Sequence, residues 1–350
     1  MFNKINFFSS FDVLHASLPP GNYFLLIADK TPLEKAHFEN NFNVVGALFP
    51  RIIYENESYE NGIIVAQLNE NTYMQIIPNI NDTSKLYLTE DIKSLFLIID
   101  GLSPKCDTFL ESLYSLLPEK TKIIGSGAGK HNLQHEPVIF DGKTFYQDRA
   151  IIIYSEDSIG IGIKHGFEPL VKPLIATETE MHCLKKINFR NAFALYKEAI
   201  EKNSQHCLTT VNFNQIANHY PFGVFHFGKD YSVRSPIKTD GENLFLMGNI
   251  DQNSIMAILH STPEQLIAAA DCATQKACEH KESPLHNICV VECISRYLFL
   301  GDRFKEELIA IHNHFQHTVP SWGMLSISQI ANPNEENIQL YNKTCIIGAF

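Results

Sequence analysis

The segment GSGAGK, residues 125–130, places three glycines at alternate positions before a lysine, a composition that could hold a phosphate group. A Walker-type loop needs a glycine separated by four residues from its Gly-Lys pair, and a serine or threonine after the lysine. Ile124 and His131 occupy those two positions. The spacing GxGxG also misses the dinucleotide-binding pattern, and the residues that follow alternate and turn as strands do, whereas both motifs open a helix. We interpret the segment as a crossing of backbones or the wall of another pocket, with Gly125 and Ser126 as candidate ligand contacts.

Two arginines follow apolar segments that have the composition of strands. Arg296 lies directly after one such segment and Arg234 occupies a similar strand-end position. Open α/β sheets place their ligands at the carboxyl ends of strands, where a guanidinium can bind a carboxylate through two hydrogen bonds. Both arginines are therefore candidate ligand contacts. For Arg296 the alternative is a structural ion pair with Glu306 or Glu307 of the following helix.

Four further residues are candidate ligand contacts: Trp322, Gly323, Gln329 and His165. Trp322, the only tryptophan, precedes Gly323 in a glycine turn, where it could wall a small ligand or fill the core. Gln329 could supply an amide to that pocket. His165 has an ordinary pKa near neutrality and could act as an acid or base, or could be a hydrogen-bonded structural histidine. The spacing assigns no serine or cysteine nucleophile with a third partner, so we predict no catalytic residue.

Histidines and cysteines do not have the spacing of metal ligands. Of the three histidines in IHNHFQH, only His314 and His317 share a helix face, because positions i and i+2 point apart. No CxxC pair occurs among Cys272, Cys278, Cys289 and Cys293, which we interpret as buried thiols. We predict neither a metal site nor a cofactor.

A weak internal repeat would position these side chains. Each copy reads as a strand, a polar or helix-compatible segment, a strand that ends near a glycine, and a further strand. The strands of the three copies are residues 24–28, 44–46 and 62–66; then 96–100, 123–125 and 150–153; then 288–293, 321–323 and 344–348. The short runs rich in isoleucine and valine suit buried strands, and the order strand–helix–strand suggests parallel neighbours. We predict an α/β fold of mixed α+β character, with repeated strand–helix–strand–strand units forming mixed sheets flanked by helices.

A second region separates the second and third copies. Residues 188–203 have helical periodicity, residues 220–259 read as short strands punctuated by glycine and proline, and residues 262–280 read as a helix that begins near Pro263. A polar stretch, TETEMHCLKK, precedes this region. We place a boundary there and expect two halves, residues 1–178 and 179–350.

Composition excludes several classes of protein. Hydrophobic residues make up 45% of the chain and charged residues 19%, which supports a large core. The net charge of −11 argues against a nucleic-acid-binding surface. No apolar stretch is long enough for a membrane span, no signal peptide is recognised, and the eight cysteines are irregularly spaced. These features predict a cytoplasmic protein.

The order of several motifs resembles the FIST family. In the first half these are KIIGSGAG, VIFDGKTFYQDRAIIIY and the His-Gly-aromatic step at residues 165–167. The second half contributes residues 220–223, 233–236, 292–296, 300–301 with Glu307, and Gly323. Two departures stand out: Ser328-Gln329-Ile330 replaces the family's Gly-Glu-Ile, and the turn at residues 46–51 is bulkier than usual.

The resemblance implies a sensory module, not an enzyme. Its two adjoining halves would bind a small polar molecule, such as an amino acid or a related carboxylate, and would signal through a protein partner. An F-box-like helical segment does not fit in the roughly twenty residues before the first expected strand, so we expect a stand-alone module. The alternatives are a ligand-independent interaction scaffold and, less favoured, an uncharacterised enzyme that uses His165 or a cysteine.

Overall fold

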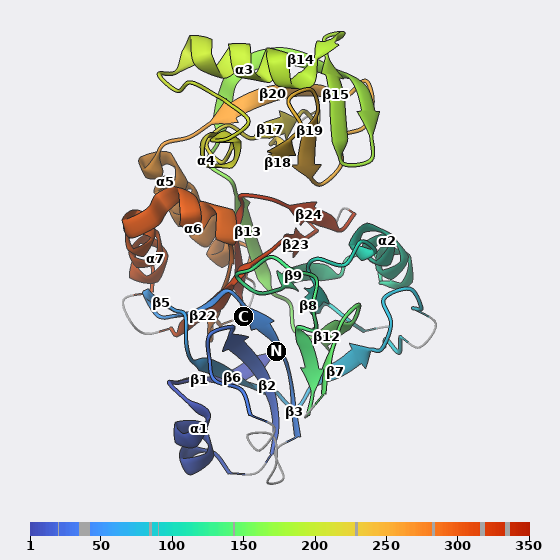
Figure 1. Cartoon of the computed structure of the whole chain (residues 1–350). Coiled ribbons are helices and arrows are strands. Elements are labelled where there is room, and N and C mark those ends of the chain that lie inside the picture. The colour runs from blue at the N-terminus through green and yellow to red at the C-terminus, as the bar shows by residue number, and fades with distance from the viewer. Residues whose placement is uncertain are drawn as a thin grey trace.

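Three sheets form a core at one end of the molecule, and a fourth sheet forms a separate layer at the other end (Figure 1). The computed structural model describes residues 1–19, 21–34, 43–83, 86–89, 91–142, 144–227, 230–281, 284–315, 319–332 and 337–350. Both chain termini lie in the core (Figure 1). Within the described ranges, the helices are too short or too polar to cross a membrane.

A pair of parallel strands stands at the centre of each core sheet, as the repeat predicted. The pairs are β2 (Asn22–Ala28) with β3 (Asn43–Phe49), β8 (Ser94–Asp100) with β9 (Lys122–Ala128), and β21 (Ile288–Cys293) with β22 (Ser321–Ser326). The last strand of each unit lies antiparallel beside its pair; these strands are β6 (Ile63–Leu68), β12 (Ala150–Ser155) and β25 (Cys345–Ala349). The predicted threefold repetition and the mixed sheets are therefore confirmed.

Sequence reasoning missed an outer strand in each unit. These strands are β1 (Phe2–Phe8), β7 (Thr72–Ile77) and β13 (Gly160–Lys164), which pair with β6, β12 and β25 respectively. The expectation that the first strand begins near residue 24 was wrong, because β1 and the helix α1 (Phe11–Ser17) precede it. The helix-compatible segment of the first unit falls mostly on residues 35–42, outside the described ranges.

The three units exchange strands in a cycle. Each unit contributes a short antiparallel pair: β4 (Arg51–Tyr54) with β5 (Glu57–Tyr59), β10 (Ile139–Asp141) with β11 (Thr144–Tyr146), and β23 (Gln329–Ala331) with β24 (Gln339–Tyr341). The first of these pairs extends the sheet of the third unit through β22, the second extends the first sheet through β3, and the third extends the second sheet through β9. Each sheet is therefore completed by another unit.

The glycine at the middle of each parallel pair explains the segment that first suggested a phosphate loop. A Cβ atom added there would lie 2.1, 2.5 or 1.9 Å from a carbonyl oxygen of the neighbouring strand, at Gly46, Gly125 and Gly323 respectively. These distances are far below van der Waals contact, so a side chain would push the two strands apart. Residues 122–128 continue as strand β9 and open no helix, which confirms the interpretation as a backbone crossing.

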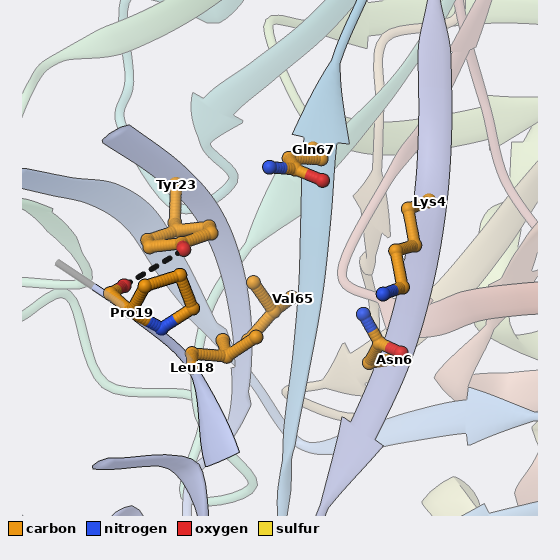
Figure 2. A pocket seen from close by; sticks show the side chains of 7 residues that line it. All are labelled: Lys4, Asn6, Leu18, Pro19, Tyr23, Val65 and Gln67. Carbon is orange, nitrogen blue, oxygen red and sulfur yellow. Dashed lines mark hydrogen bonds between the residues drawn. The ribbon is translucent and has the colours of Figure 1, made fainter. Parts of the chain in front are cut away.

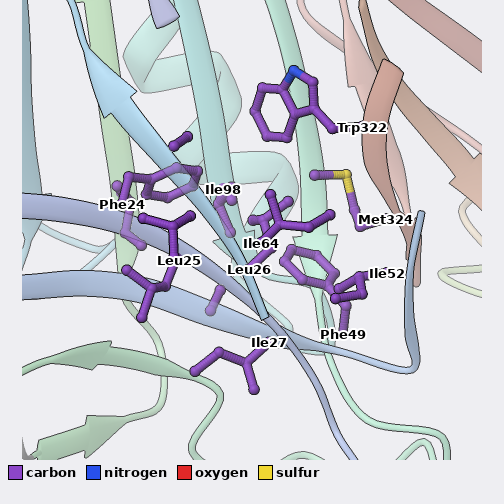
Figure 3. Packing of buried hydrophobic residues seen from close by; sticks show 14 of the residues in the cluster. Phe24, Leu25, Leu26, Ile27, Phe49, Ile52, Ile64, Ile98, Trp322 and Met324 are labelled. Carbon is purple, nitrogen blue, oxygen red and sulfur yellow. The ribbon is translucent and has the colours of Figure 1, made fainter. Parts of the chain in front are cut away.

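Aromatic side chains fill the space where the three core sheets meet. Phe2 makes edge contacts with Phe96, Trp322 and Phe350, with ring centroids 5.4, 4.9 and 5.2 Å apart. Phe24 stacks on Phe2, with ring centroids 6.2 Å apart. Figure 3 shows residues of β2, β6 and β22 converging on this core. Because edge-to-face aromatic pairs stabilise beyond their buried area, this cluster ties the three units together.

Helices cover the outer faces of the core sheets. The helix α2 (Cys106–Leu116) packs on the second sheet through Phe109, Leu110 and Leu113. The third sheet is covered by α5 (Pro263–Glu279), α6 (Ile294–Leu300), a 3₁₀ turn (Gly301–Arg303) and α7 (Phe304–Asn313). The helix α5 begins at Pro263, as its sequence predicted, and Thr262 forms a capping box with Gln265.

The fourth sheet is an insertion within the third unit, between β13 and β21. Its strands are β14 (Glu168–Glu180), β20 (Ile255–His260), β17 (Phe222–Val224), β18 (Ser232–Thr239), β19 (Leu244–Met247), β15 (Cys183–Ile187) and β16 (Arg190–Asn191). The sheet closes on itself through the β14–β15 pairing. The helices α3 (Ala192–Asn203) and α4 (Phe213–Ala217) pack against it. The expected boundary at residue 178 lies inside β14.

Replacing Gly125 with alanine should destabilise the fold. The new Cβ would meet the Leu97 carbonyl oxygen at 2.5 Å, and overpacking of this kind costs about 1 to 3 kcal/mol. Chemical denaturation of Gly125→Ala measures the loss. The control is Gly142→Asn, at a turn with φ +57° and nothing within 4 Å, where the free energy of unfolding should change by less than about 0.5 kcal/mol. Equal effects of the two substitutions would contradict the crowding argument.

Candidate functional site

The predicted site residues lie in four separate places. Arg296 and His165 meet in a buried ion cluster, and Trp322 with Gly323 lies in the core. The pairing of β9 with β23 brings Gly125, Ser126 and Gln329 together. Arg234 lies where the insertion meets the core, beside Asn342.

Arg296 is fully buried, and internal partners surround its guanidinium. Its Nε lies 2.8 Å from a carboxyl oxygen of Glu292, and one terminal nitrogen contacts Glu307. The terminal nitrogens also donate to the carbonyls of His165, at 2.7 Å, and Leu266, at 3.0 Å. Of the two interpretations, the structure shows the ion pair with Glu307. The expectation that Arg296 binds a ligand carboxylate does not fit this structure, because the guanidinium is 0% exposed.

The buried ion cluster joins elements that are distant in sequence. Glu292 is the penultimate residue of β21, Arg296 lies in α6, and Glu307 lies in α7. The His165 carbonyl follows β13, where the chain leaves for the insertion. Burial raises the pKa of both carboxyl groups, against the opposing effect of Arg296. Breaking such a buried pair typically costs about 3 to 5 kcal/mol, so the cluster has a structural role.

His165 is held in a neutral state. Its Nδ1 accepts a hydrogen bond from the Phe167 amide at 2.9 Å. Burial lowers its pKa to about 4, so the imidazole is uncharged at neutral pH. Its Nε2 is buried and has no hydrogen-bond partner among the described residues. The structural interpretation of His165 therefore fits better than an acid–base role near neutrality.

Trp322 and Gly323 are core residues. Trp322 is 0% exposed, and its indole nitrogen donates to the Asn287 side-chain oxygen at 2.9 Å. Gly323 lies beside it in β22, against the Val290 carbonyl. The alternative of a core filler is the one observed. The expectation that Trp322 forms the wall of a ligand pocket does not fit this structure, because the indole packs within the aromatic cluster.

The structure brings Gly125, Ser126 and Gln329 together in a closed place. Ser126 lies opposite Gln329 in the β9–β23 pair, and the Gln329 amide donates to the Ser326 hydroxyl at 2.8 Å. The Ser126 hydroxyl and the Gln329 amide oxygen are buried without hydrogen-bond partners among the described residues. Sequence reasoning had placed Gln329 with Trp322 and not with Ser126. Ser126 and Gln329 are packed between strands and are 0% exposed.

Arg234 occupies a different environment, on β18 facing the core. Its Nε donates to the Asn249 carbonyl at 2.9 Å, and a terminal nitrogen donates to the carbonyl of Val233 at 3.0 Å. Among the described residues, no carboxylate forms an ion pair with it. Burial lowers its pKa, while the charges of Asp107 and Asp251 act in the opposite direction. Arg234 is thus a partly buried cation that has no carboxylate ion pair among the described residues.

Polar groups lie on both sides of the junction, and Asn342 of the core lies beside Arg234. The Asn342 amide donates to the Met247 carbonyl at 3.1 Å and lies 3.5 Å from the Val233 carbonyl that also accepts from Arg234. The next residue, Lys343, is buried, and its ammonium donates to the Asn218 side chain at 2.5 Å. We call Arg234, Asn342, Lys343 and Asn218 the junction site, because Asn218 and Arg234 belong to the insertion and the other two to the core.

One small pocket lies elsewhere, on the first core sheet. It has a volume of about 130 Å³ and is lined by Lys4, Asn6, Leu18, Pro19, Tyr23, Val65 and Gln67 (Figure 2). The Tyr23 hydroxyl donates to the Pro19 carbonyl at one side of the pocket, at 2.8 Å (Figure 2). None of the predicted site residues lines this pocket.

A grouping that sequence reasoning missed consists of Asp100, His135 and Asp148. Their ligand-type atoms all lie within 4.8 Å of one another, and no other such group of three occurs within the described ranges. Asp100 ends β8, so the strand-end rule that selected the arginines could have selected it. His135 and Asp148 lie in later loops without a recognisable motif. Of the earlier metal candidates, His314 pairs with Asp271, and His317 lies outside the described ranges.

Two family models match the chain in succession. The FIST N domain model matches residues 30–190, and the FIST C domain model matches residues 192–332. No curated protein matches. One similar solved structure is described as a crystal structure of chorismatase, with 8% sequence identity over 100% of this chain and 99% of that chain. Its TM-score of 0.33 is too low to carry an argument.

The junction site should make stability depend on pH in the alkaline range. Burial lowers the pKa of Lys343 from 10.5 to about 8. Between these values the unfolded chain binds a proton at Lys343 that the folded chain lacks, so this residue makes stability rise with pH. The contribution should approach roughly 3 kcal/mol.

Comparison with Lys343→Met isolates this contribution from that of buried thiols, such as Cys289, whose raised pKa has the opposite effect. Urea denaturation of both proteins from about pH 7.5 to 10.5 measures it. The control Lys197→Met, at a side chain 40% exposed, should keep the wild-type profile. Parallel profiles for wild type and Lys343→Met would contradict the prediction.

Proposed function

Because the chain belongs to the FIST family, whose domains are recognised as sensory-type domains, we propose that it binds a small carboxylate-bearing molecule at the junction site. The ligand would be an amino acid or a close relative, and binding would be passed on to a protein partner. In this proposal Arg234 is the main ligand contact, taking the role that Arg296 was expected to share.

The environment of Arg234 is the observation that carries the proposal. Its guanidinium is partly buried and donates to two main-chain carbonyls, which carry no full negative charge. A charge in such a place is costly unless an opposite charge compensates it. A ligand carboxylate would supply that charge and could accept two parallel hydrogen bonds from the planar fork.

Neighbouring groups favour an amino acid over a simple acid. Asp107, at the start of α2, and Asp251, after β19, lie close enough to influence Arg234 without pairing with it. These carboxylates could attract a ligand ammonium while Arg234 holds the ligand carboxylate. The Asn342 amide lies on the core side of the same junction, beside Arg234.

The proposed site binds and does not catalyse. A guanidinium held by carbonyls is a donor that stays protonated, so it serves as neither a nucleophile nor a general base near neutral pH. Since the site joins the insertion to the core, a ligand there could change how firmly the two are held. A partner that contacts both parts would then sense the ligand.

Ligand screening tests the proposal. Thermal-shift measurements on the full chain with amino acids and simple mono- and dicarboxylates should give at least one stabilising compound, which calorimetry then quantifies. Arg234→Met should weaken its binding about 10- to 100-fold, since hydrogen bonds to charged groups contribute about 1.5 to 3 kcal/mol.

The matched control is Arg303→Met, which removes a guanidinium from an exposed ion pair with Glu306 and should leave binding unchanged. Either a panel without a single binder or an affinity that survives Arg234→Met would count against the proposal.

An exposed apolar row favours a second candidate function, a ligand-independent interaction scaffold. Ile175, Ile255 and Phe225 lie opposite one another across β14, β20 and the end of β17, and they are 41%, 51% and 45% exposed. Phe189 is 83% exposed. It follows Asn188, whose main-chain N–H donates to the Ile175 carbonyl. Contiguous apolar surface of this kind often marks an interaction site.

The scaffold candidate predicts stoichiometric capture of a partner by ligand-free protein. The double variant Phe225→Ser/Ile255→Ser should abolish capture, because it removes two apolar side chains from the row. Leu298→Ser, at a 58% exposed leucine on α6, should not affect it. Quantitative pull-down with each purified full chain measures the difference, and capture that needs an added carboxylate ligand would favour the sensory proposal instead.

A further inference from the structure

We propose that Asp100, His135 and Asp148 form a divalent metal site that is separate from the junction site. The three residues come from the end of β8, the loop after β9 and the loop before β12. These elements belong to the second core unit, beside α2 (Figure 1).

Two separations between the three side chains are close to the edges of a coordination shell. The His135 Nε2 lies 3.0 Å from an Asp100 carboxyl oxygen and 3.5 Å from one of Asp148. Zinc-type bonds to nitrogen and oxygen are about 2.1 Å long, which places neighbouring ligands of a tetrahedral or octahedral ion roughly 3.0 to 3.4 Å apart. One ion could therefore contact all three atoms with little movement.

Both carboxylates are held in place by the surrounding chain. Asp100 accepts hydrogen bonds from the amides of Asp148, at 2.9 Å, and Leu102, at 3.3 Å. Asp148 has φ +53° and accepts a hydrogen bond from the Ser103 hydroxyl at 2.5 Å. Hydrogen bonds to ligand atoms of this kind orient metal ligands and tune their affinity.

The nearby cations are engaged elsewhere. Lys130 pairs with Glu136 at 3.0 Å, and the Arg149 guanidinium lies over the Tyr146 ring, 3.3 Å from its centroid. With a neutral imidazole, the two carboxylates give the site a charge of −2, which a divalent ion would neutralise. The side chains of His135 and Asp148 are each 35% exposed, so an ion can enter from solvent.

The repeat supplies an independent comparison. Asp100 is the last residue of β8, and the equivalent last residues of β2 and β21 are Ala28 and Cys293. Only the second unit places a carboxylate at this strand end. The site is therefore a feature of one unit and not a requirement of the shared fold.

The ligand set selects the class of metal. One imidazole and two carboxylates suit Mn²⁺, Fe²⁺ or Zn²⁺ better than Mg²⁺, which prefers oxygen ligands alone. Three protein ligands leave further coordination positions open, as in sites that bind a water or a small chelating molecule. The alternative is a protonated His135 that bridges the two carboxylates without metal.

Calorimetric titration with MnCl₂ tests the proposal on the full chain after chelator treatment. Manganese is the better probe, because zinc could also bind thiols such as the exposed Cys207. Wild type should bind about one ion and gain thermal stability with increasing Mn²⁺. His135→Gln and Asp148→Asn should each weaken binding by more than about 100-fold, since even outer hydrogen-bond partners contribute 10- to 100-fold.

Two further variants keep the test decisive. Glu111→Gln removes an exposed carboxylate from α2 and should bind Mn²⁺ as wild type does. Ser103→Ala leaves all three ligands in place and should weaken binding about 10- to 100-fold, even if the ligand variants fold poorly. The proposal is overturned if wild type shows no saturable Mn²⁺ binding, or if binding is unchanged in the His135, Asp148 and Ser103 variants.

Discussion

The fold depends on close approach within three pairs of parallel strands. Glycine stands at the same register in each pair, where a Cβ would fall within 2.5 Å of a carbonyl oxygen. This contact fixes which residues can lie at the centre of each sheet and brings the strands together over the aromatic core. Because each sheet also receives strands from another unit, loosening one pair would disturb two units at once. The glycines are therefore a shared structural requirement and not a binding motif.

A second constraint attaches the insertion to this core. The chain leaves the third unit after β13 and returns through α5. Both connections must be fixed to the core, although a whole sheet separates them in the sequence. Arg296 meets this need, because it binds the His165 carbonyl at one crossing and the Leu266 carbonyl of α5 at the other. Its charge is offset by Glu292 and Glu307 within the same buried cluster. An arginine one helical turn beyond a strand thus serves attachment here, and Arg234 is the guanidinium that we propose as a ligand contact.

Sequence predicted the local pattern well and the long-range arrangement less well. Apolar runs and glycines located the repeated strands, because those features are confined to a few residues. The exchange of strands between units has no local signature, since it depends on which distant edges remain unpaired. The same reason explains the outcome for the site residues. Nothing in the spacing distinguishes Arg296, whose carboxylates are buried with it, from Arg234, and Asp100 lies 35 residues from His135.

The three units differ most where the shared constraint ends. The central glycine is fixed in every unit. The residue paired with it lies on the first strand of the parallel pair, and this strand ends three residues later, where the close approach no longer restricts the side chain. There the first unit has Ala28, the second has Asp100, and the third has Cys293 before the ion cluster of Arg296. One end is apolar, one gathers metal-type ligands, and one secures the insertion. A repeated scaffold can therefore carry unlike chemistry at equivalent corners, because packing determines the middle of each strand and leaves its end free to vary.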